Sequence, residues 1–171
     1  MRGWLFDTNV LSETRKRKPD SNVAAFVAAQ AGDLLFTTDV TFGEIRFGIE
    51  QLQDAARRAE IRLWLDRTLR PWFAGRVLPI TEDVVVRWKT MVAEGRNRGQ
   101  TFSQPDLFIA AIAALEDLVV VTRDVNQFRE ARVPVFDPWL SVLHVHGHEI
   151  VLQAPASLEA AAEAAAASGN G

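Results

Sequence analysis

Short apolar runs alternate along the chain with longer segments in which apolar residues recur at helical spacing. The runs are rich in β-branched and aromatic residues, which predicts buried strands at residues 4–6, 34–36, 77–80 and 118–121. The run at 118–121 is continuously apolar, as expected of a central parallel strand covered on both faces. Residues 133–136 predict an edge strand, because Pro134 cannot donate to a central hydrogen-bond ladder.

The intervening segments predict helices. They cover residues 22–31 with Asn22 as the cap, a segment that opens near Thr41, an amphipathic stretch over 54–70, and residues 82–95 and 105–116. The last of these is apolar nearly all round, which indicates a buried helix. Strands alternating with helices predict an α/β protein, a three-layer α/β/α fold with a central, mainly parallel sheet. No internal repeat is evident.

The character of the sequence changes after Trp139. We therefore divide the chain into a domain over residues 1–140 and an extension over 141–171. Residues 141–155 predict a hairpin around the pair His146 and Gly147, and residues 156–171 predict a frayed helix or a flexible, Ala-rich tail. On one strand, the alternating His144, His146 and His148 would share a face and suggest a zinc site. A polar face beside a turn is the plainer interpretation, and we assign these histidines no catalytic role.

Composition narrows the function classes. At 171 residues, with 48% hydrophobic and 24% charged residues, the chain has room for one domain with a full core. A net charge of −3 excludes a strongly basic coat for nucleic acid, but not a local basic patch. The absence of cysteine excludes disulfides, thiolate zinc sites and cysteine nucleophiles. With no signal-like stretch and no membrane-length apolar run, we expect a soluble cytoplasmic protein without a membrane partner.

Four acidic residues stand where a predicted strand ends or a predicted helix begins. They are Asp7, Glu44, Asp106 and Asp124. The carboxyl edge of a parallel sheet is where α/β proteins gather their functional side chains. Four carboxylates at one edge repel one another unless a divalent cation lies between them. The pattern therefore predicts a metal-dependent hydrolase.

Each acid also has a purely structural interpretation. Three of them match the spacing of residues that cap the first turn of a helix: Thr41 with Glu44, Ser103 with Asp106, and Asp124 with Gln127. Asp7 could accept hydrogen bonds in a turn before Asn9. The set as a whole favours the metal site, because unpaired carboxylates beside a buried helix and a buried strand are costly. Helix N-termini aimed at the same place offset part of the repulsion.

Four segments resemble the PIN-domain ribonucleases, in particular the VapC and FitB type of bacterial toxins. The resemblance covers the chain from about residue 4 to Trp139, and the segments keep the order and spacing of that family. They are residues 5–13 (LFDTNVLSE), 43–49 (GEIRFGI), 105–111 (PDLFIAA) and 121–128 (VTRDVNQF).

This resemblance implies an endoribonuclease that requires Mg²⁺ or Mn²⁺. The implied metal ligands are the four acids, and the implied orienting residues are Thr8, Asn9 and Thr122. Four acids can hold one ion or two. Because no histidine pair lies near them, we expect in-line attack by water activated by the metal, which leaves a 5′-phosphate and a 3′-hydroxyl.

The resemblance also implies a small antitoxin partner and a homodimer. Several basic residues flank the motifs and are candidate contacts for RNA or antitoxin: Arg15, Arg17, Arg46, Arg96 and Arg98. Phe42 and Phe47, like Arg46, could also serve the antitoxin interface or a homodimer, but we expect the two phenylalanines to pack in the core. Gly43 and Gly48 weaken a helix, which predicts a closely approaching neighbour at each.

Two other functions remain open at this point. A haloacid dehalogenase-like phosphatase also begins with an aspartate after its first strand, but it requires a second aspartate where this chain has Asn9, and no candidate lysine lies near Asp106. A non-catalytic module of the same fold would bind a partner only. The presence of all four acids argues against it.

Overall fold

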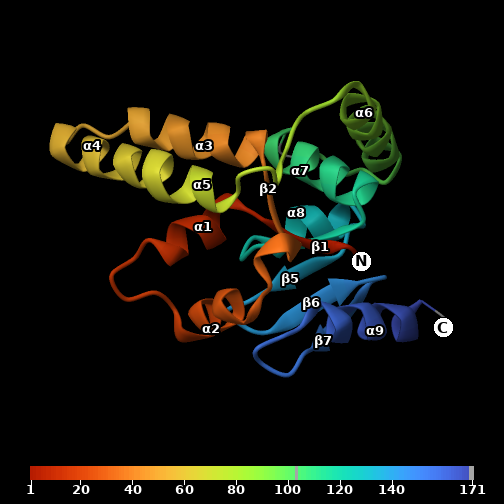
Figure 1. Cartoon of the computed structure of the whole chain (residues 1–171). Helices are drawn as coiled ribbons and strands as arrows, with labels where there is room; N and C mark the ends of the chain where they lie inside the picture. The colour runs from red at the N-terminus through yellow and green to blue at the C-terminus, as the bar shows by residue number, and fades with distance from the viewer. Residues whose placement is uncertain (103, 170–171) are drawn as a thin grey trace.

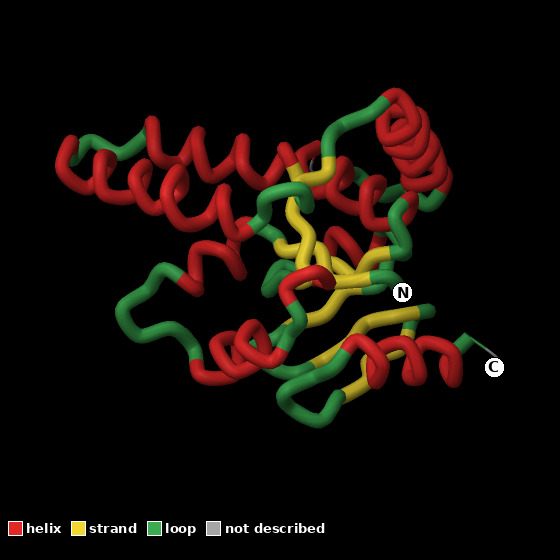
Figure 2. The backbone as a smooth tube through the Cα atoms, viewed as in Figure 1, coloured by secondary structure: helices red, strands yellow, loops and turns green. Residues whose placement is uncertain are grey.

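A seven-stranded sheet forms the centre of the computed structural model, which describes residues 1–102 and 104–169 (Figures 1 and 2). The strand order is β3-β2-β1-β4-β5-β6-β7, parallel from β3 to β5 and antiparallel from β5 to β7. The strands are β1 (Gly3–Phe6), β2 (Leu35–Thr38), β3 (Val77–Leu78), β4 (Leu118–Val121), β5 (Val135–Asp137), β6 (Val142–Val145) and β7 (His148–Val151).

Helices cover both faces of this sheet (Figure 1). They are α1 (Thr8–Thr14), α2 (Ser21–Ala29), α3 (Asp39–Glu50), α4 (Ala55–Trp64), α5 (Arg70–Trp72), α6 (Glu82–Asn97), α7 (Gln104–Leu115), α8 (Val125–Glu130) and α9 (Leu158–Ser168), with a 3₁₀ turn η1 (Gly32–Leu34) and a π-helical turn η2 (Leu65–Leu69) that joins α4 to α5. The predicted three-layer α/β/α fold with a mainly parallel sheet is confirmed.

Successive side chains of the central strands point to opposite faces of the sheet, so the hydrophobic core has two parts, one on each face. In β1, Trp4 and Phe6 face α1, α2 and α9, whereas Leu5 packs with Val120 of β4 against α6, α7 and α8. All these side chains are buried. A strand with apolar residues on both faces requires a layer of helices on each side, which is why the continuous run at 118–121 lies inside the sheet.

The expectation of an edge strand around Pro134 is wrong. β5 lies inside the sheet, between β4 and β6. Pro134 precedes the first paired residue, and its carbonyl accepts the backbone N–H of Val120 at 3.0 Å. Proline lacks only the donor, so it is compatible with an internal strand where the ladder requires an acceptor.

Three predicted element boundaries also differ from the structure. The cap of α2 is Asp20, whose carboxylate accepts the N–H groups of Asn22 and Val23, so Asn22 is not the cap. The helix predicted near Thr41 begins at Asp39, with Thr38 as its cap. The helix predicted over residues 82–95 continues to Asn97 as α6.

The C-terminal segment joins the same sheet. A hairpin is present where it was predicted, and its turn residues His146 and Gly147 have φ values of 52° and 81°. Residues 158–168 form α9, capped by Ser157 and with Ala161 buried, so a helix is present in the segment predicted to be a frayed helix or a flexible tail; residues 170 and 171 lie outside the described residues. The division of the chain at residue 140 stays a prediction.

The three histidines do not share a strand face. His144 pairs with Glu149 and His148 pairs with Val145, and paired positions in an antiparallel ladder point to the same side of the sheet. Adjacent pairs point to opposite sides, so His144 and His148 lie on different faces. The described part of the chain contains no cluster of three histidine or acidic side chains that could hold a metal.

Helix α3 leaves one side open. Phe42 is buried as predicted, but Phe47 is 67% exposed, so the expectation that it packs in the core is wrong. A Cβ at Gly43 or Gly48 would meet nothing within 4 Å, so the close neighbours predicted there are also missing within the described chain. Across residues 1–102 and 104–169, no helix has the length and apolar character required to cross a bilayer.

We predict opposite effects for two glycine-to-alanine changes. In Gly3→Ala, the new Cβ would lie 2.6 Å from the carbonyl oxygen of Leu34 and 2.8 Å from the ring of Phe36, which should lower the free energy of unfolding by about 1–3 kcal/mol. In Gly48→Ala, the open helical position should raise it by about 1 kcal/mol. Urea unfolding without metal measures both. Equal stability of the Gly3→Ala variant and the wild type would contradict the close approach of β1 to β2.

Candidate metal centre at the carboxyl edge

Asp7 is the first residue after β1 and the cap of α1. Its carboxylate accepts hydrogen bonds from the backbone N–H of Thr8 at 2.7 Å, the hydroxyl of Thr122 at 2.8 Å and the amide of Asn9 at 3.3 Å. The backbone N–H of Asp7 donates to the carbonyl of Val121 at 3.1 Å, which ties it to the end of β4. These contacts hold a buried carboxylate between the ends of two central strands.

The position of Asp7 follows from the topology. β1 lies between β2 and β4, so the chain leaves β1 at the point where the strand order changes direction. Crevices outside the carboxyl ends of parallel strands form at such a point. The aspartate therefore stands at the most favourable place in this fold for a ligand.

The ionisation of Asp7 is strongly perturbed. Burial raises the pKa of its carboxyl from 3.8 to about 6, against the hydrogen bonds from Thr122 and Thr8, which lower it. The negative charges of Glu44 and Asp106 raise it further. These two carboxylates, from α3 and α7, therefore lie within electrostatic range of Asp7.

Glu44 reaches the site through Thr8. The hydroxyl of Thr8 donates to the Glu44 carboxylate at 2.7 Å, while the backbone N–H of the same threonine donates to Asp7. Thr8 therefore connects two acids that are far apart in the sequence. The capping interpretation of Glu44 is wrong, because Thr38 caps α3 and Thr41 lies inside the helix.

Asp106 and Asp124 lie at helix starts, as Asp7 does, whereas Glu44 lies inside α3 and not at the junction predicted for it. Asp106 lies in the first turn of α7, and its proposed capping partner Ser103 is outside the described residues. Asp124 precedes α8, but its side chain makes no capping hydrogen bond, so the capping interpretation is wrong there. Its backbone N–H donates to the hydroxyl of Thr122 at 3.1 Å. Thr122 thus links the Asp124 loop to Asp7.

Asn9 completes this hydrogen-bond network. Its amide donates to the hydroxyl of Thr122 at 2.7 Å, and its side-chain oxygen accepts the backbone N–H of Arg123 at 3.2 Å. The structure therefore places Thr8, Asn9 and Thr122 in contact with the acids or with the loop that carries them.

The donor set suits Mg²⁺ or Mn²⁺, because carboxylate oxygens are the ligands such cations prefer. A buried carboxyl with a raised pKa beside two further acids has the electrostatics that a cation relieves. Among residues 1–102 and 104–169, no three acidic or histidine side chains are already clustered closely enough to bind metal. Asp7, Glu44, Asp106 and Asp124 are the residues that would hold it.

The candidate arginines fall into different environments. Arg15 lies over the ring of Trp64 at 5.8 Å, so it packs against α4. Arg98 donates to the side chain of Gln100 and to the carbonyl of Glu130. The remaining three are exposed, and their roles stay predictions: Arg17, Arg46 and Arg96.

Sequence reasoning missed Glu13, which is only 6% exposed. Its carboxylate accepts the Lys16 ammonium at 2.5 Å and the backbone N–H of Asp20 at 2.9 Å, and these bonds hold its pKa below the usual value. Glu13 thereby ties the basic loop between α1 and α2 to the end of α1. The available signal was its spacing of three residues from Lys16, which follows the end of α1.

We predict that Asp7→Asn changes the pH dependence of stability. The unfolded chain releases the Asp7 proton near pH 4 and the folded chain near pH 6, so the free energy of unfolding of the wild type falls across this window and is level above it. The shift corresponds to at most about 3 kcal/mol. Without metal, the variant should be about 1–3 kcal/mol more stable than the wild type at pH 7.5 and equally stable at pH 4.

Urea unfolding in EDTA at a series of pH values measures this difference. Saturating Mg²⁺ should stabilise the wild type and leave the variant unchanged. A stability difference that does not vary between pH 4 and pH 7 would show that Asp7 is not the perturbed group.

Comparison with known proteins identifies the family of this chain. The family model described as PIN domain matches residues 4–133. The chain is 33% identical over 135 residues to the VapC ribonuclease Y4jK of Sinorhizobium fredii, an alignment that covers 79% of this chain and 96% of the relative. It is 32% identical over 135 residues to the toxin FitB of Neisseria gonorrhoeae, with 79% of this chain and 97% of that protein covered.

A solved structure shows the same arrangement of elements. The crystal structure of FitAcB from Neisseria gonorrhoeae superimposes with a TM-score of 0.75 at 32% identity, and the match covers 80% of this chain and 98% of that chain. The family resemblance found in the four sequence segments is confirmed. This chain belongs to the PIN-domain family and is similar to its VapC and FitB toxins.

Proposed function

We propose that this protein is a divalent-metal-dependent endoribonuclease and the toxin of a toxin–antitoxin pair. The observation that carries the proposal is the buried Asp7 carboxyl, whose pKa is raised to about 6 and which lies within range of Glu44 and Asp106. Nuclease activity on RNA is further supported by the similarity to a relative named VapC ribonuclease, and the toxin role by the similarity to FitB.

In the proposed reaction, a water molecule attacks a phosphodiester in line and leaves a 5′-phosphate and a 3′-hydroxyl. Asp7, Glu44, Asp106 and Asp124 would hold a divalent cation, which would neutralise charge at the phosphate and lower the pKa of water. The protein's own part is orientation. Thr122 and the Thr8 backbone fix the Asp7 carboxylate, and the Thr8 hydroxyl fixes Glu44.

A protein partner belongs to the same proposal. A ribonuclease that acts inside its own cell requires an inhibitor, and the resemblance to VapC and FitB toxins implies a small antitoxin. A homodimer stays a prediction. The phosphatase alternative is not favoured, because it requires an aspartate at position 9. The side-chain amide of Asn9 donates hydrogen bonds to Asp7 and Thr122, and an aspartate carboxylate could not donate them.

We predict that Asp106→Asn abolishes metal-dependent cleavage. Purified protein should cut single-stranded RNA with Mg²⁺ or Mn²⁺ and not with EDTA, and the substitution should lower the rate at least about 100-fold, because a ligand charge is lost. A matched control is Asp66→Asn in η2, whose carboxylate pairs with Arg70 at 3.3 Å. Products bearing a 2′,3′-cyclic phosphate, or full activity of Asp106→Asn, would reject the mechanism. Inactivity of the wild type on every RNA would favour the non-catalytic module.

We also predict that Thr8→Val weakens metal use without unfolding the protein. The substitution removes the hydroxyl that holds Glu44 but keeps the backbone N–H that holds Asp7. The Mg²⁺ concentration for half-maximal cleavage should rise about 10- to 100-fold. The control is Thr14→Val, because the hydroxyl of Thr14 bonds only to the carbonyl of Leu11 within the same helix. Equal metal requirements for both variants would show that Thr8 does not orient Glu44.

A further inference from the structure

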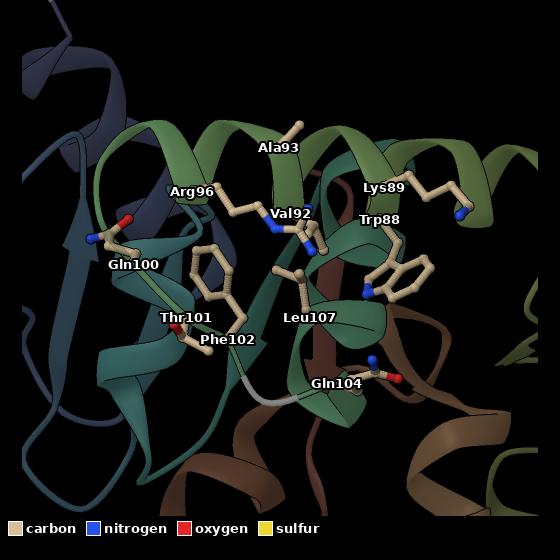
Figure 3. Close-up of a pocket in the computed structure, with 10 residues that line it drawn as sticks. All are labelled: Trp88, Lys89, Val92, Ala93, Arg96, Gln100, Thr101, Phe102, Gln104 and Leu107. Atoms are coloured by element: carbon tan, nitrogen blue, oxygen red, sulfur yellow. The ribbon is translucent and has the colours of Figure 1, made fainter.

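A cavity of about 470 Å³ lies between α6, α7 and the loop that joins them (Figure 3). Aromatic and aliphatic side chains form part of its wall, among them Trp88, Phe102 and Leu107. The remaining wall is polar. In Figure 3 the guanidinium of Arg96 extends from α6 into the space between Phe102 and Trp88. No function described above uses this cavity.

The charge of the cavity is opposite to that of the whole chain. Its ten lining residues include Lys89 and Arg96 and no acid, although the net charge of the protein is −3. Within residues 1–102 and 104–169 neither cation forms an ion pair. Lys89 lies 5.5 Å from the Trp88 ring centroid. Two uncompensated cations in one concave wall favour an anionic ligand.

Trp88 contributes a rigid aromatic ring to the cavity wall. The indole stacks on Phe108, with ring centroids 4.8 Å apart and planes 18° apart, which holds it in place. Its Nε1 is buried, so the indole offers the cavity an apolar surface and not a hydrogen bond.

The ring of Phe102 packs directly against the backbone of Gly95. A Cβ at Gly95 would lie 2.2 Å from Cε2 of Phe102, so the ring occupies the space that a larger residue would fill. Phe102 remains half-buried and lines the cavity. An aromatic ring beside cations is the combination that binds unpaired bases of single-stranded nucleic acid.

The cavity adjoins the proposed catalytic site. Gln104 and Leu107 line it, and Asp106 lies between them in the first turn of α7. Successive helical residues are separated by about 100°, so Asp106 points about 200° away from Gln104. The two sites therefore lie on opposite sides of one helix end, roughly 10 Å apart. A few nucleotides of one strand span that distance.

We propose that this cavity is a subsite for an unpaired nucleotide of the RNA substrate, a few positions from the cleaved bond. Arg96 and Lys89 bind the phosphate backbone, Phe102 contacts the base, and Gln104 supplies hydrogen bonds. The proposal rests on the proposed ribonuclease function and adds a place where sequence preference arises. An acidic protein segment is the competing occupant, and it lacks the bases that Phe102 would stack against.

The test measures binding of the full-length protein to a fluorescein-labelled, ten-nucleotide RNA of randomised sequence, in EDTA, by fluorescence anisotropy. Arg96→Gln and Lys89→Gln should each weaken binding roughly 3- to 10-fold. The slope of log affinity against log salt should fall by about 0.7 for each lost phosphate contact. The control is Arg87→Gln on the same helix, whose side chain lies 3.8 Å from Glu94 and does not line the cavity. It should change neither quantity.

In cleavage assays with Mg²⁺, Arg96→Gln should raise KM with kcat unchanged and alter the base preference around the cleaved bond. Equal RNA affinity of Arg96→Gln and Arg87→Gln overturns the proposal. Unchanged RNA affinity together with weaker binding of a polyglutamate peptide overturns it in favour of a protein-docking surface. If RNA binding depends on Arg96 but the wild type cleaves nothing, the ribonuclease assignment fails and the subsite stands.

Discussion

The burial of one carboxylate, that of Asp7, is the constraint on which the rest of the site depends. Hydrogen bonds from Thr122 and from the Thr8 backbone favour its charged form, but they do not compensate for the loss of water, and its pKa rises to about 6. The folded chain therefore carries at neutral pH a charge that its own groups stabilise incompletely. A cation is the simplest way to recover that free energy, so the metal requirement is proposed from the fold itself.

The same constraint explains the neighbours of Asp7. Thr122 accepts the amide of Asn9 and the N–H of Asp124 and still donates to Asp7, so one hydroxyl fixes the geometry of two loops. Thr8 does the equivalent for α1 and α3. Both threonines therefore connect residues that come from separate strands and helices. Asp7, Asp106 and Asp124 lie at helix starts, whose positive dipole ends are near them, whereas Glu44 lies inside α3.

The sequence was informative where the signal was local. Residues 118–121 and the acids at element junctions follow from continuous apolar runs and from the turn residues beside them. Contacts between distant segments were not predictable in this way. Whether Pro134 lies at an edge depends on the hairpin that adds β6 and β7 beyond it, and the role of Glu44 depends on a hydroxyl 36 residues away. The start of α3 was predicted near Thr41 instead of at Asp39, because Thr38 and Thr41 lie three residues apart and either hydroxyl could cap a helix.

Electrostatics connects the proposed subsite with the proposed reaction. An RNA strand that approaches four carboxylates meets repulsion, and a bound divalent cation compensates for it only close to the metal. The strand beyond that point requires positive charge from the protein. In a chain with net charge −3, this charge must be concentrated rather than spread over the surface. Arg96 and Lys89 line one cavity on the far side of the α7 start, where they would attract the strand without neutralising Asp106 itself. The acids remain available for metal, and the helix end separates the two kinds of charge.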